Sequence, residues 1–398
     1  MSISKKVGGI APSLTLEITA KAKKMKAEGI SVISFGAGEP DFNTPDYVIE
    51  SAKKALDIGF TKYTPASGTA ELKKAICEKF EKDNGLSYFP ENIVVSNGAK
   101  GSLFHAIAAL IDDGDEVIIP SPYWLTYPEL VKLAGGKCVF VKCDADSGYK
   151  ITADALDKSI TEKTKLLILN SPNNPTGAVY GKDELSSIAK VVENRGIFVI
   201  SDEIYEKLVY SGEKHYSIAS FGEYMKEHTV VVNGVSKSYS MTGWRIGYLA
   251  APAKIAKAIG SMQSHTASNP CSISQYASVT ALTDERGKDF IVKMQKIFDE
   301  RRVYALERIK AIKGLKCIEP KGAFYVFVDV SAYYGKTFDG NLINGSLSFA
   351  GSALKKGVAL IPGIAFGDDN CVRLSYAISK EDIKEGLDRI ESFLEELK

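Results

Sequence analysis

The chain has 398 residues, of which 45% are hydrophobic and 25% are charged, and its 50 basic residues nearly cancel its 49 acidic ones. This composition is that of a globular protein and excludes disordered, collagen-like and coiled-coil chains. The net charge of +1 provides no basic footprint for nucleic acid or an anionic membrane, so we expect neither as a partner.

Cysteine and histidine usage bears on metal binding and on the cellular compartment. The six cysteines are scattered without a CxxC pair and there are four histidines, so we expect no metal site. Thiols without a disulfide framework are typical of a reducing compartment. The first residues lack the apolar core of a signal peptide, and no run approaches the roughly eighteen apolar residues that span a bilayer. We therefore predict a cytoplasmic protein.

Short β-branched runs alternate with helical periodicities over most of the chain. Runs such as KLLIL and IFVI are apolar throughout, which indicates strands buried on both faces of a mainly parallel, doubly wound α/β sheet. Such sheets bind ligands beyond the carboxyl ends of their strands. The predicted strands are 31–35, 93–96, 116–119, 165–170, 197–201, 229–233 and 246–250, and the predicted helices include 70–84, 100–111 and 182–194.

The pattern changes after about residue 285. A long amphipathic helix is predicted over 290–312, then a strand over 324–329, a Gly/Tyr-rich loop around 333–345 and an amphipathic helix over 381–397. The Lys-rich stretch 21–26 is typical of a solvated helix face. We predict two domains: a large domain over 41–288, and a smaller α+β domain formed by 1–40 together with 289–398.

Polar residues follow several predicted strands at the edge where a ligand would bind. Small residues at 96–100 (SNGAK) open a predicted helix, whose first N–H groups favour a phosphate. The rigid turn SPNNPTG would fix the amide of Asn174, and Asp202 ends a buried strand. Lys237 lies among small residues past another strand, where desolvation would favour the neutral, nucleophilic amine. Arg245 lies near the same edge.

Each of these features alone has an ordinary structural interpretation. They could be a strand–turn–helix connection, a rigid turn, a helix N-cap at Asp202 and an exposed loop lysine at position 237. Together with the phenol of Tyr205, they assemble what an aromatic aldehyde bearing a phosphate requires. Pyridoxal phosphate forms a Schiff base with a lysine, and a carboxylate keeps its ring nitrogen protonated.

The motif series GAGEPDF, KYTPASG, SPYW, SPNNPTG, SDEIY, SKSYSMTGWRIGY, GAFY and VRLSYA resembles that of class I pyridoxal-phosphate-dependent aminotransferases of fold type I. The motifs occur in the family's order from residue 36 to residue 377, and they are most similar to the bacterial aspartate aminotransferase branch. The resemblance implies a large domain with a mainly parallel seven-stranded sheet flanked by helices. It also implies a homodimer with shared active sites, and ping-pong transfer of an amino group from an L-amino acid to 2-oxoglutarate.

The resemblance further implies roles for matching positions. Lys237 would bind the cofactor covalently and move the substrate proton, Asp202 would pair with the ring nitrogen, and Asn174 and Tyr205 would contact the ring 3-oxygen. Many relatives have a hydroxyl three positions before the lysine, where this chain has Gly234, and Ser236 could compensate in part. The remaining implied cofactor contacts are Gly98, Ala99, Lys100, Trp124, Arg245 and, from a neighbouring subunit, Tyr63; the implied substrate contacts are Gly38, Trp124, Asn174 and Arg373, which clamps the α-carboxylate.

The choice of amino acid depends on a second cation. In the bacterial branch a lysine at the position of Lys100 binds the side-chain carboxylate of aspartate, and hydroxyl groups at the positions of Ser13 and Thr15 assist it. The presence of all three residues in this chain favours aspartate as the substrate. Dual aspartate/prephenate enzymes usually carry a basic residue where this chain has Ala11. Other aminotransferase substrates, including aromatic amino acids and prephenate, remain open, as does a pyridoxal-phosphate-dependent carbon–sulfur β-lyase. A pyridoxal-phosphate-binding transcriptional sensor would need an added DNA-binding domain, for which the motif series leaves no space. A nicotinamide-dependent enzyme would need a complete GxGxxG fingerprint, which this sequence lacks.

Overall fold

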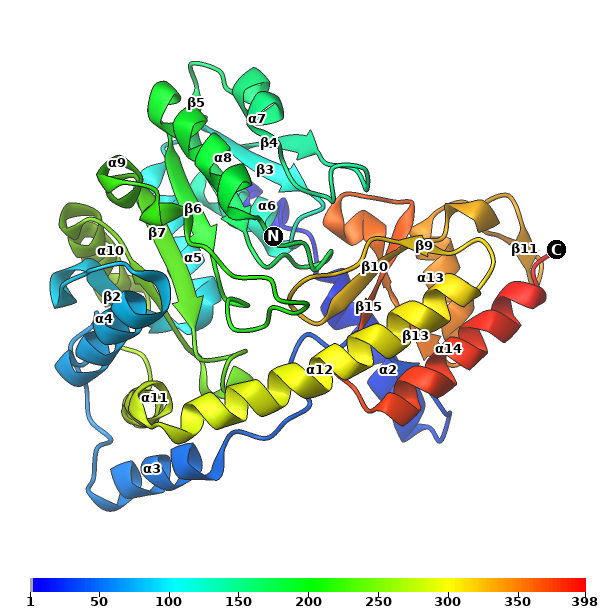
Figure 1. Ribbon diagram of the computed structural model, residues 1–398, viewed down its shortest axis with the longest axis horizontal. Coiled ribbons are helices and arrows are strands. Elements are labelled where there is room, and N and C mark those ends of the chain that lie inside the picture. Colours follow the sequence, from blue (N-terminus) through cyan, green and yellow to red (C-terminus); the bar gives the residue numbers. More distant parts are fainter. Residues whose placement is uncertain (1–2) are drawn as a thin grey trace.

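The computed structural model describes residues 3–398 and contains a seven-stranded and a four-stranded sheet (Figure 1). The larger sheet has the order β2-β8-β7-β6-β5-β3-β4, in which β8 is antiparallel to both neighbours and the remaining adjacent strands are parallel. The predicted mainly parallel seven-stranded sheet is therefore confirmed. Its strands are β2 (Ile93–Asn97), β3 (Glu116–Ser121), β4 (Lys137–Lys142), β5 (Thr164–Asn170), β6 (Phe198–Asp202), β7 (Thr229–Gly234) and β8 (Ile246–Ala250).

Both faces of this sheet are buried, as the continuous apolar runs predict. Along β7, Val230 and Val232 pack into the core on one face and Val231 packs into the core on the other, because successive side chains of a strand point in opposite directions. Helices cover both faces in Figure 1. The carboxyl ends of β5, β6 and β7 consequently meet at one edge, which is the edge that carries the predicted polar residues.

The smaller sheet is antiparallel and has the order β14-β15-β10-β9. A two-stranded parallel pair joins β1 to β13, so the predicted strand 31–35 belongs outside the seven-stranded sheet. The division into domains at 41–288 and at 1–40 with 289–398 remains a prediction. The strands in this part are β1 (Ile33–Ser34), β9 (Lys316–Cys317), β10 (Tyr325–Asp329), β11 (Thr337–Phe338), β12 (Asn341–Leu342), β13 (Val358–Ala359), β14 (Ile361–Pro362) and β15 (Cys371–Ser375).

The long helix α12 runs from the neighbourhood of α11 toward α14 and links the two parts of the molecule (Figure 1). It begins four residues earlier than the periodicity predicts. None of the helices in the described part of the chain is long and apolar enough to cross a membrane. The helices are α1 (Lys5–Gly8), α2 (Leu14–Ala27), α3 (Asp46–Asp57), α4 (Ala70–Asn84), α5 (Gly98–Leu110), α6 (Thr126–Ala134), α7 (Ala153–Ser159), α8 (Lys182–Arg195), α9 (Glu223–Glu227), α10 (Ala253–Thr266), α11 (Ser272–Thr283), α12 (Arg286–Ala311), α13 (Ser346–Lys355) and α14 (Lys380–Glu395).

Two further details of the predicted elements are wrong. Strand β4 is absent from the prediction, because it is a half-exposed edge strand that begins and ends with lysine and lacks the continuous apolar run of the inner strands. The predicted loop around 333–345 contains the short hairpin β11–β12. Neither difference alters the edge at which β5, β6 and β7 end.

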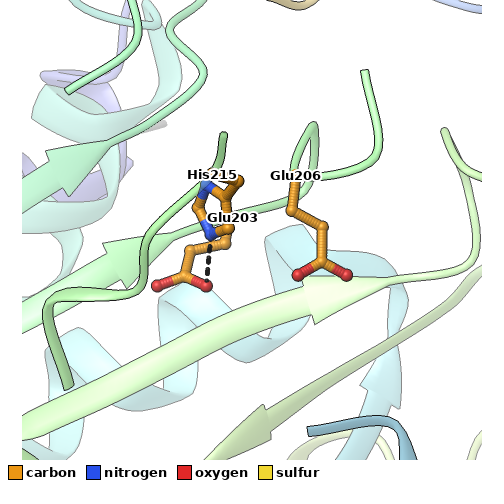
Figure 2. Close-up of side chains that lie close together, drawn as sticks. All are labelled: Glu203, Glu206 and His215. Carbon is orange, nitrogen blue, oxygen red and sulfur yellow. Dashed lines mark hydrogen bonds and ion pairs between the residues drawn. The ribbon is translucent and has the colours of Figure 1, made fainter. Parts of the chain in front are cut away.

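A buried group of charged side chains lies beside β6. One carboxylate oxygen each of Glu203 and Glu206 and a ring nitrogen of His215 lie within 4.8 Å of one another, close enough to hold a metal ion (Figure 2). Their oxygens already have donors: His215, Ser201 and Ser217 bind Glu203, and Lys79 and Asn84 bind Glu206. Because an ammonium group already neutralises Glu206, we interpret the group as an ion-pair network that ties α4 to the segment after β6.

We predict that replacing Lys79 by methionine lowers the free energy of unfolding by about 3 kcal/mol at pH 7, because Glu206 would stay buried without its partner. Burial alone would raise the pKa of Glu206, but Lys79, Lys207 and His215 lower it to about 2. The stabilisation is therefore complete above the ordinary value of 4.5 and is lost as the pH falls toward 2. Urea denaturation at pH 7 and near pH 3 measures the effect.

Lys74→Met is the matched control, because Lys74 lies on the same helix but its side chain is exposed and its ion pair with Glu78 is at the surface. It should change stability by less than about 0.5 kcal/mol at either pH. A Lys79→Met deficit of the same size at both pH values would contradict the ion-pair interpretation.

Candidate active site

A cavity of about 370 Å³ lies at the edge where β5, β6 and β7 end, between that edge, the four-stranded sheet and the start of α2. This volume is in the range of small-molecule sites. Most of the residues predicted for the site line it: Ser13, Thr15, Gly38, Ala99, Lys100, Trp124, Asn174, Asp202, Tyr205, Ser236, Lys237, Arg245 and Arg373.

Two predicted residues do not line the cavity. Gly98 is the first residue of α5 and packs behind Arg245, so it shapes the wall of the cavity. Tyr63 is 91% exposed on the surface of the single chain. Its predicted contact with a neighbouring subunit remains a prediction.

Lys237 follows β7 and extends its amine into the cavity. Nζ donates a hydrogen bond of 2.5 Å to the carbonyl oxygen of Gly38. Burial lowers the pKa of Lys237 to about 8, with Arg245 and Arg373 acting in the same direction and Glu39 opposing them. The predicted lowering is therefore confirmed in direction and cause, and a useful fraction of the amine is neutral near physiological pH.

Asp202 is the last residue of β6 and is 2% exposed. Its Oδ2 accepts a hydrogen bond of 2.6 Å from the hydroxyl of Tyr127, and its Oδ1 accepts one of 3.3 Å from the backbone N–H of Ile204. Burial raises the pKa of Asp202 to about 6, and the bonds from Tyr127 and Ile204 oppose the rise. Asp202 begins no helix, so the N-cap alternative is wrong. A buried carboxylate with only neutral hydrogen-bond donors suits a cationic ligand atom.

The N-terminus of α5 and Arg245 form an anion-binding corner. Gly98 has φ +75° and a Cβ there would lie 2.4 Å from the guanidinium of Arg245, so a residue with a side chain would clash. Gly247 on β8 lets α5 approach closely, because a Cβ on it would lie 2.1 Å from the backbone nitrogen of Ala99. The free N–H groups of the first turn and Arg245 together favour a phosphate.

The packing explains why position 234 lacks a hydroxyl side chain. Gly234 pairs with Gly247 in the register of β7 and β8. A Cβ on Gly234 would lie 3.0 Å from the carbonyl oxygen of Ile246, which leaves little space for any side chain. Ser236 lies within the cavity wall and offers the hydroxyl that position 234 lacks.

Arg373 is 2% exposed at the floor of the cavity, on β15. Its Nη1 donates a hydrogen bond of 2.9 Å to Oδ1 of Asn174, and its Nη2 donates one of 3.3 Å to the carbonyl oxygen of Gly36. Its Nε is buried and has no hydrogen-bond partner among residues 3–398, although such groups are normally paired. The guanidinium therefore keeps donors available for a planar anion such as a carboxylate.

The opposite wall carries a second cation and two hydroxyl groups. The Nζ of Lys100 lies 4.9 Å from the ring centroid of Trp124, and burial, with help from Arg245, lowers the pKa of Lys100. Ser13 caps α2, and the Oγ1 of Thr15 is buried without a partner among residues 3–398. These groups line the same cavity as Arg373, Arg245 and Lys237, so the cavity offers several cations to a ligand with two carboxylates.

Sequence reasoning missed two tyrosines in the cavity wall. Tyr127 on α6 binds Asp202, and Tyr325 on β10 has its hydroxyl 3.0 Å from that of Tyr205. Tyr127 follows Trp124 by three residues in a run that enters a helix, but its partner lies 75 residues away in sequence. Tyr325 belongs to the GAFY motif, whose pattern alone assigns it no contact.

These residues fit pyridoxal phosphate in their donor types. The N–H groups of α5 and the side chain of Arg245 can bind the phosphate. The amine of Lys237, whose pKa is lowered, can react with the aldehyde, and Asp202 can pair with a protonated ring nitrogen. The unpartnered Nε of Arg373 and Oγ1 of Thr15 are available for a substrate. The arrangement can therefore bind an anionic aromatic aldehyde and a dicarboxylate side by side.

Comparison with known proteins agrees with this geometry. The family model described as aminotransferase class I and II matches residues 30–390. An aspartate aminotransferase of Bacillus sp. strain YM-2 is 48% identical over 98% of this chain and 99% of its own length, and a probable aspartate/prephenate aminotransferase of Aquifex aeolicus is 47% identical over 99% of both. The crystal structure of the aspartate aminotransferase from Rhizobium meliloti superposes with a TM-score of 0.96 at 42% identity and covers all of both chains.

Proposed function

Because this chain belongs to the aminotransferase class I and II family, whose members depend on pyridoxal phosphate, we propose that it is a pyridoxal-phosphate-dependent aspartate aminotransferase. It would move the amino group of L-aspartate to 2-oxoglutarate in two half-reactions. The observation that carries the proposal is that Lys237 and the buried Asp202 line one cavity together with three further cationic side chains, Lys100, Arg245 and Arg373.

In this proposal the strand ends of the large sheet bind the cofactor. Lys237 would hold the aldehyde carbon covalently, Asp202 would accept the ring N–H, and Asn174 and Tyr205 would donate hydrogen bonds to the ring 3-oxygen. The ring of Trp124 would contact the cofactor ring. The first turn of α5 (Gly98, Ala99, Lys100), with Ser236 and Arg245, would bind the phosphate.

The cofactor, when bound, supplies an electron sink that stabilises negative charge at the substrate Cα. The amine of Lys237 would accept the proton from the substrate Cα as a general base. Its lowered pKa suits this task, because an amine with its ordinary pKa would be almost fully protonated near neutral pH. Asp202 keeps its charge with the help of Tyr127 and thereby keeps the ring nitrogen protonated.

The substrate would lie between two of the cationic side chains, Arg373 and Lys100. Arg373 binds the α-carboxylate with its planar fork, while Gly38 contributes a backbone contact. Lys100 binds the side-chain carboxylate, with the hydroxyls of Ser13 and Thr15 beside it. Lys100 lies in the first turn of α5, where the helix dipole disfavours a cation, so an anionic ligand would stabilise it.

Prephenate is the second candidate substrate, because the relative from Aquifex aeolicus carries both activities in its name. In this chain Ala11 occupies the position where dual enzymes usually have a basic residue. Ala11 lines a neighbouring cavity, and its backbone N–H binds Glu129. The lack of a cation at this position favours aspartate over prephenate.

The subunits of the proposed enzyme would form a homodimer in which Tyr63 completes the phosphate site of the neighbouring subunit. The side chain of Tyr63 is 91% exposed and thus free to contact a neighbouring subunit, and tyrosine is enriched at protein interfaces. The six free cysteines fit the reducing cytoplasm in which we propose that the enzyme works.

We predict that Lys237→Ala lowers transamination by several orders of magnitude, because it removes both the covalent attachment and the general base. The measurement is a half-reaction screen in which the cofactor-loaded protein is mixed with aspartate, glutamate, alanine or aromatic amino acids, and the absorbance of the cofactor is followed. Prephenate is tested as the acceptor in the reverse direction. Borohydride should fix the cofactor on the Lys237 peptide, as mass spectrometry would show.

Lys254→Ala is the control for this experiment, because Lys254 is an exposed lysine on α10, and it should behave as the wild type. Turnover near the wild-type rate in Lys237→Ala would refute the assignment. Pyruvate release from cysteine conjugates in place of keto-acid formation from aspartate would identify a β-lyase.

For specificity, Lys100→Met should raise the aspartate KM on the order of 10-fold to 100-fold, because it removes a charge-assisted bond to the side-chain carboxylate. Methionine retains the apolar stem beside Trp124. The KM for alanine, which has no side-chain carboxylate, should change less than about threefold. Steady-state kinetics with both substrates gives the comparison, and an equal rise for both would rule out the assigned role of Lys100.

The dimer proposal predicts that Tyr63→Phe weakens cofactor binding about tenfold, because the phosphate loses one hydrogen bond from the neighbouring subunit. Sedimentation at decreasing concentration should show cofactor release together with dimer dissociation. A monomer that retains the cofactor with full affinity and full activity would exclude a shared site.

A further inference from the structure

Tyr325 contacts both Tyr205, which follows β6 of the large sheet, and Arg373, which lies on β15 of the four-stranded sheet. It is the first residue of β10 and is 0% exposed. Its hydroxyl oxygen lies 3.0 Å from that of Tyr205, and its ring centroid lies 4.3 Å from the guanidinium carbon of Arg373. The register explains this double contact: Tyr325 pairs with Ser375, so Arg373 on β15 is its diagonal neighbour on the same face of the sheet.

We propose that Tyr325 is a positioning residue with two separable tasks: its ring orients the guanidinium of Arg373, and its hydroxyl orients the hydroxyl of Tyr205. The inference rests on the proposed function, in which Arg373 binds the substrate α-carboxylate and Tyr205 binds the ring oxygen of the cofactor. Tyr325 thus acts on the substrate side and on the cofactor side of the cavity through different parts of one side chain.

The task of the ring follows from the geometry around Arg373. A guanidinium that stacks on an aromatic face uses its flat surface for that contact and keeps its in-plane N–H groups for hydrogen bonds. A second ring, that of Phe366, has its centroid 5.1 Å from the same guanidinium carbon. Asn174 and the carbonyl oxygen of Gly36 take one donor each. The rings therefore contact the guanidinium of Arg373 without taking any of the N–H donors that a carboxylate needs.

The task of the hydroxyl follows from counting protons. The phenol of Tyr205 has a single proton, which in the proposed function goes to the ring oxygen of the cofactor. The hydroxyl of Tyr325 must then be the donor in the 3.0 Å contact. Burial keeps the pKa of Tyr205 well above its usual range, so this phenol stays neutral and able to donate. A hydroxyl that accepts a hydrogen bond becomes a stronger donor itself.

The surrounding core holds both rings in place. Tyr205 and Tyr325 belong to one buried cluster with Phe324, and their rings pack edge to face at 5.9 Å between centroids. Phe324 packs edge to face on Tyr205 at 5.5 Å. Because both rings are buried and packed edge to face, the surrounding core favours the arrangement in which the two hydroxyls meet.

Two substitutions separate the tasks. Tyr325→Phe keeps the ring and removes the hydroxyl, whereas Tyr325→Leu removes both. In each cofactor-loaded variant, we would measure the pH midpoint of the change in the cofactor's visible spectrum and the Kd of maleate. Maleate is a suitable probe because it is a dicarboxylate without an amino group and cannot react.

Tyr325→Phe should raise the spectral midpoint by about half to one pH unit, because weaker donation from Tyr205 disfavours the deprotonated chromophore, whose ring oxygen carries more negative charge. Its Kd for maleate should stay within about twofold of the wild type, because the ring remains beneath Arg373. Tyr325→Leu should raise the midpoint by the same amount and weaken maleate binding roughly tenfold.

Two further variants calibrate these effects. Tyr88→Phe is the matched control, because Tyr88 is a buried tyrosine outside the cavity whose hydroxyl has no partner among the described residues. It should change neither the midpoint nor the Kd. Tyr205→Phe removes the direct donor and should shift the midpoint further than Tyr325→Phe.

The outcomes distinguish this inference from the proposed function. A wild-type protein that binds neither pyridoxal phosphate nor maleate would count against the proposed function. A wild-type protein that binds both, with a spectral midpoint unchanged in Tyr325→Phe, would overturn the role of the hydroxyl. Equal loss of maleate affinity in Tyr325→Phe and Tyr325→Leu would overturn the role of the ring. Should the leucine variant fail to fold, Tyr325→Met tests the same loss with an unbranched, flexible side chain that adapts to irregular core space.

Discussion

The structure depends on charged groups that the fold gathers in one cavity without fully pairing them, and of these Asp202 and Arg373 are each only 2% exposed. Burial lowers the pKa values of Lys237, Lys100 and Arg373 and raises that of Asp202, so each group is pushed toward its neutral form. Such an arrangement costs free energy in the empty protein. A cofactor with a phosphate and a protonated ring nitrogen, together with a substrate that has two carboxylates, would relieve this cost at each of these positions. Their binding would stabilise the folded state.

The parallel sheet makes this concentration of charge possible. Adjacent parallel strands end at the same edge, so side chains that follow β5, β6 and β7 are brought together although they are distant in sequence. This rule connects sequence to site for Asn174, Asp202 and Lys237, each of which comes at or just after the end of a continuous apolar run. It explains why strand periodicity and a few polar residues were enough to predict this half of the cavity.

The other half could not be predicted from local patterns. Arg373 lies on a sheet of different topology, and its contact with Asn174 spans 199 residues. Tyr127 and Tyr325 look like ordinary apolar positions of a helix and a strand, and only the packing gives their hydroxyls a partner. Residues such as Arg373, Ser13 and Thr15 were assigned through resemblance to a family, because no spacing rule connects an antiparallel sheet or an N-terminal segment to the edge of a parallel one.

The groups proposed to bind the cofactor and the groups proposed to select the substrate lie on different elements. The large sheet provides the groups proposed to bind the cofactor, and their positions are fixed by buried strands and by the close approach of α5 to β8 at Gly247. The groups proposed to select the substrate come from the start of α2 and the first turn of α5, where side chains can change without disturbing a strand. Ala11 lies in the same N-terminal segment, outside the cavity wall. A substitution at the start of α2 would therefore change the groups proposed to select the substrate while Lys237 and Asp202 keep their geometry.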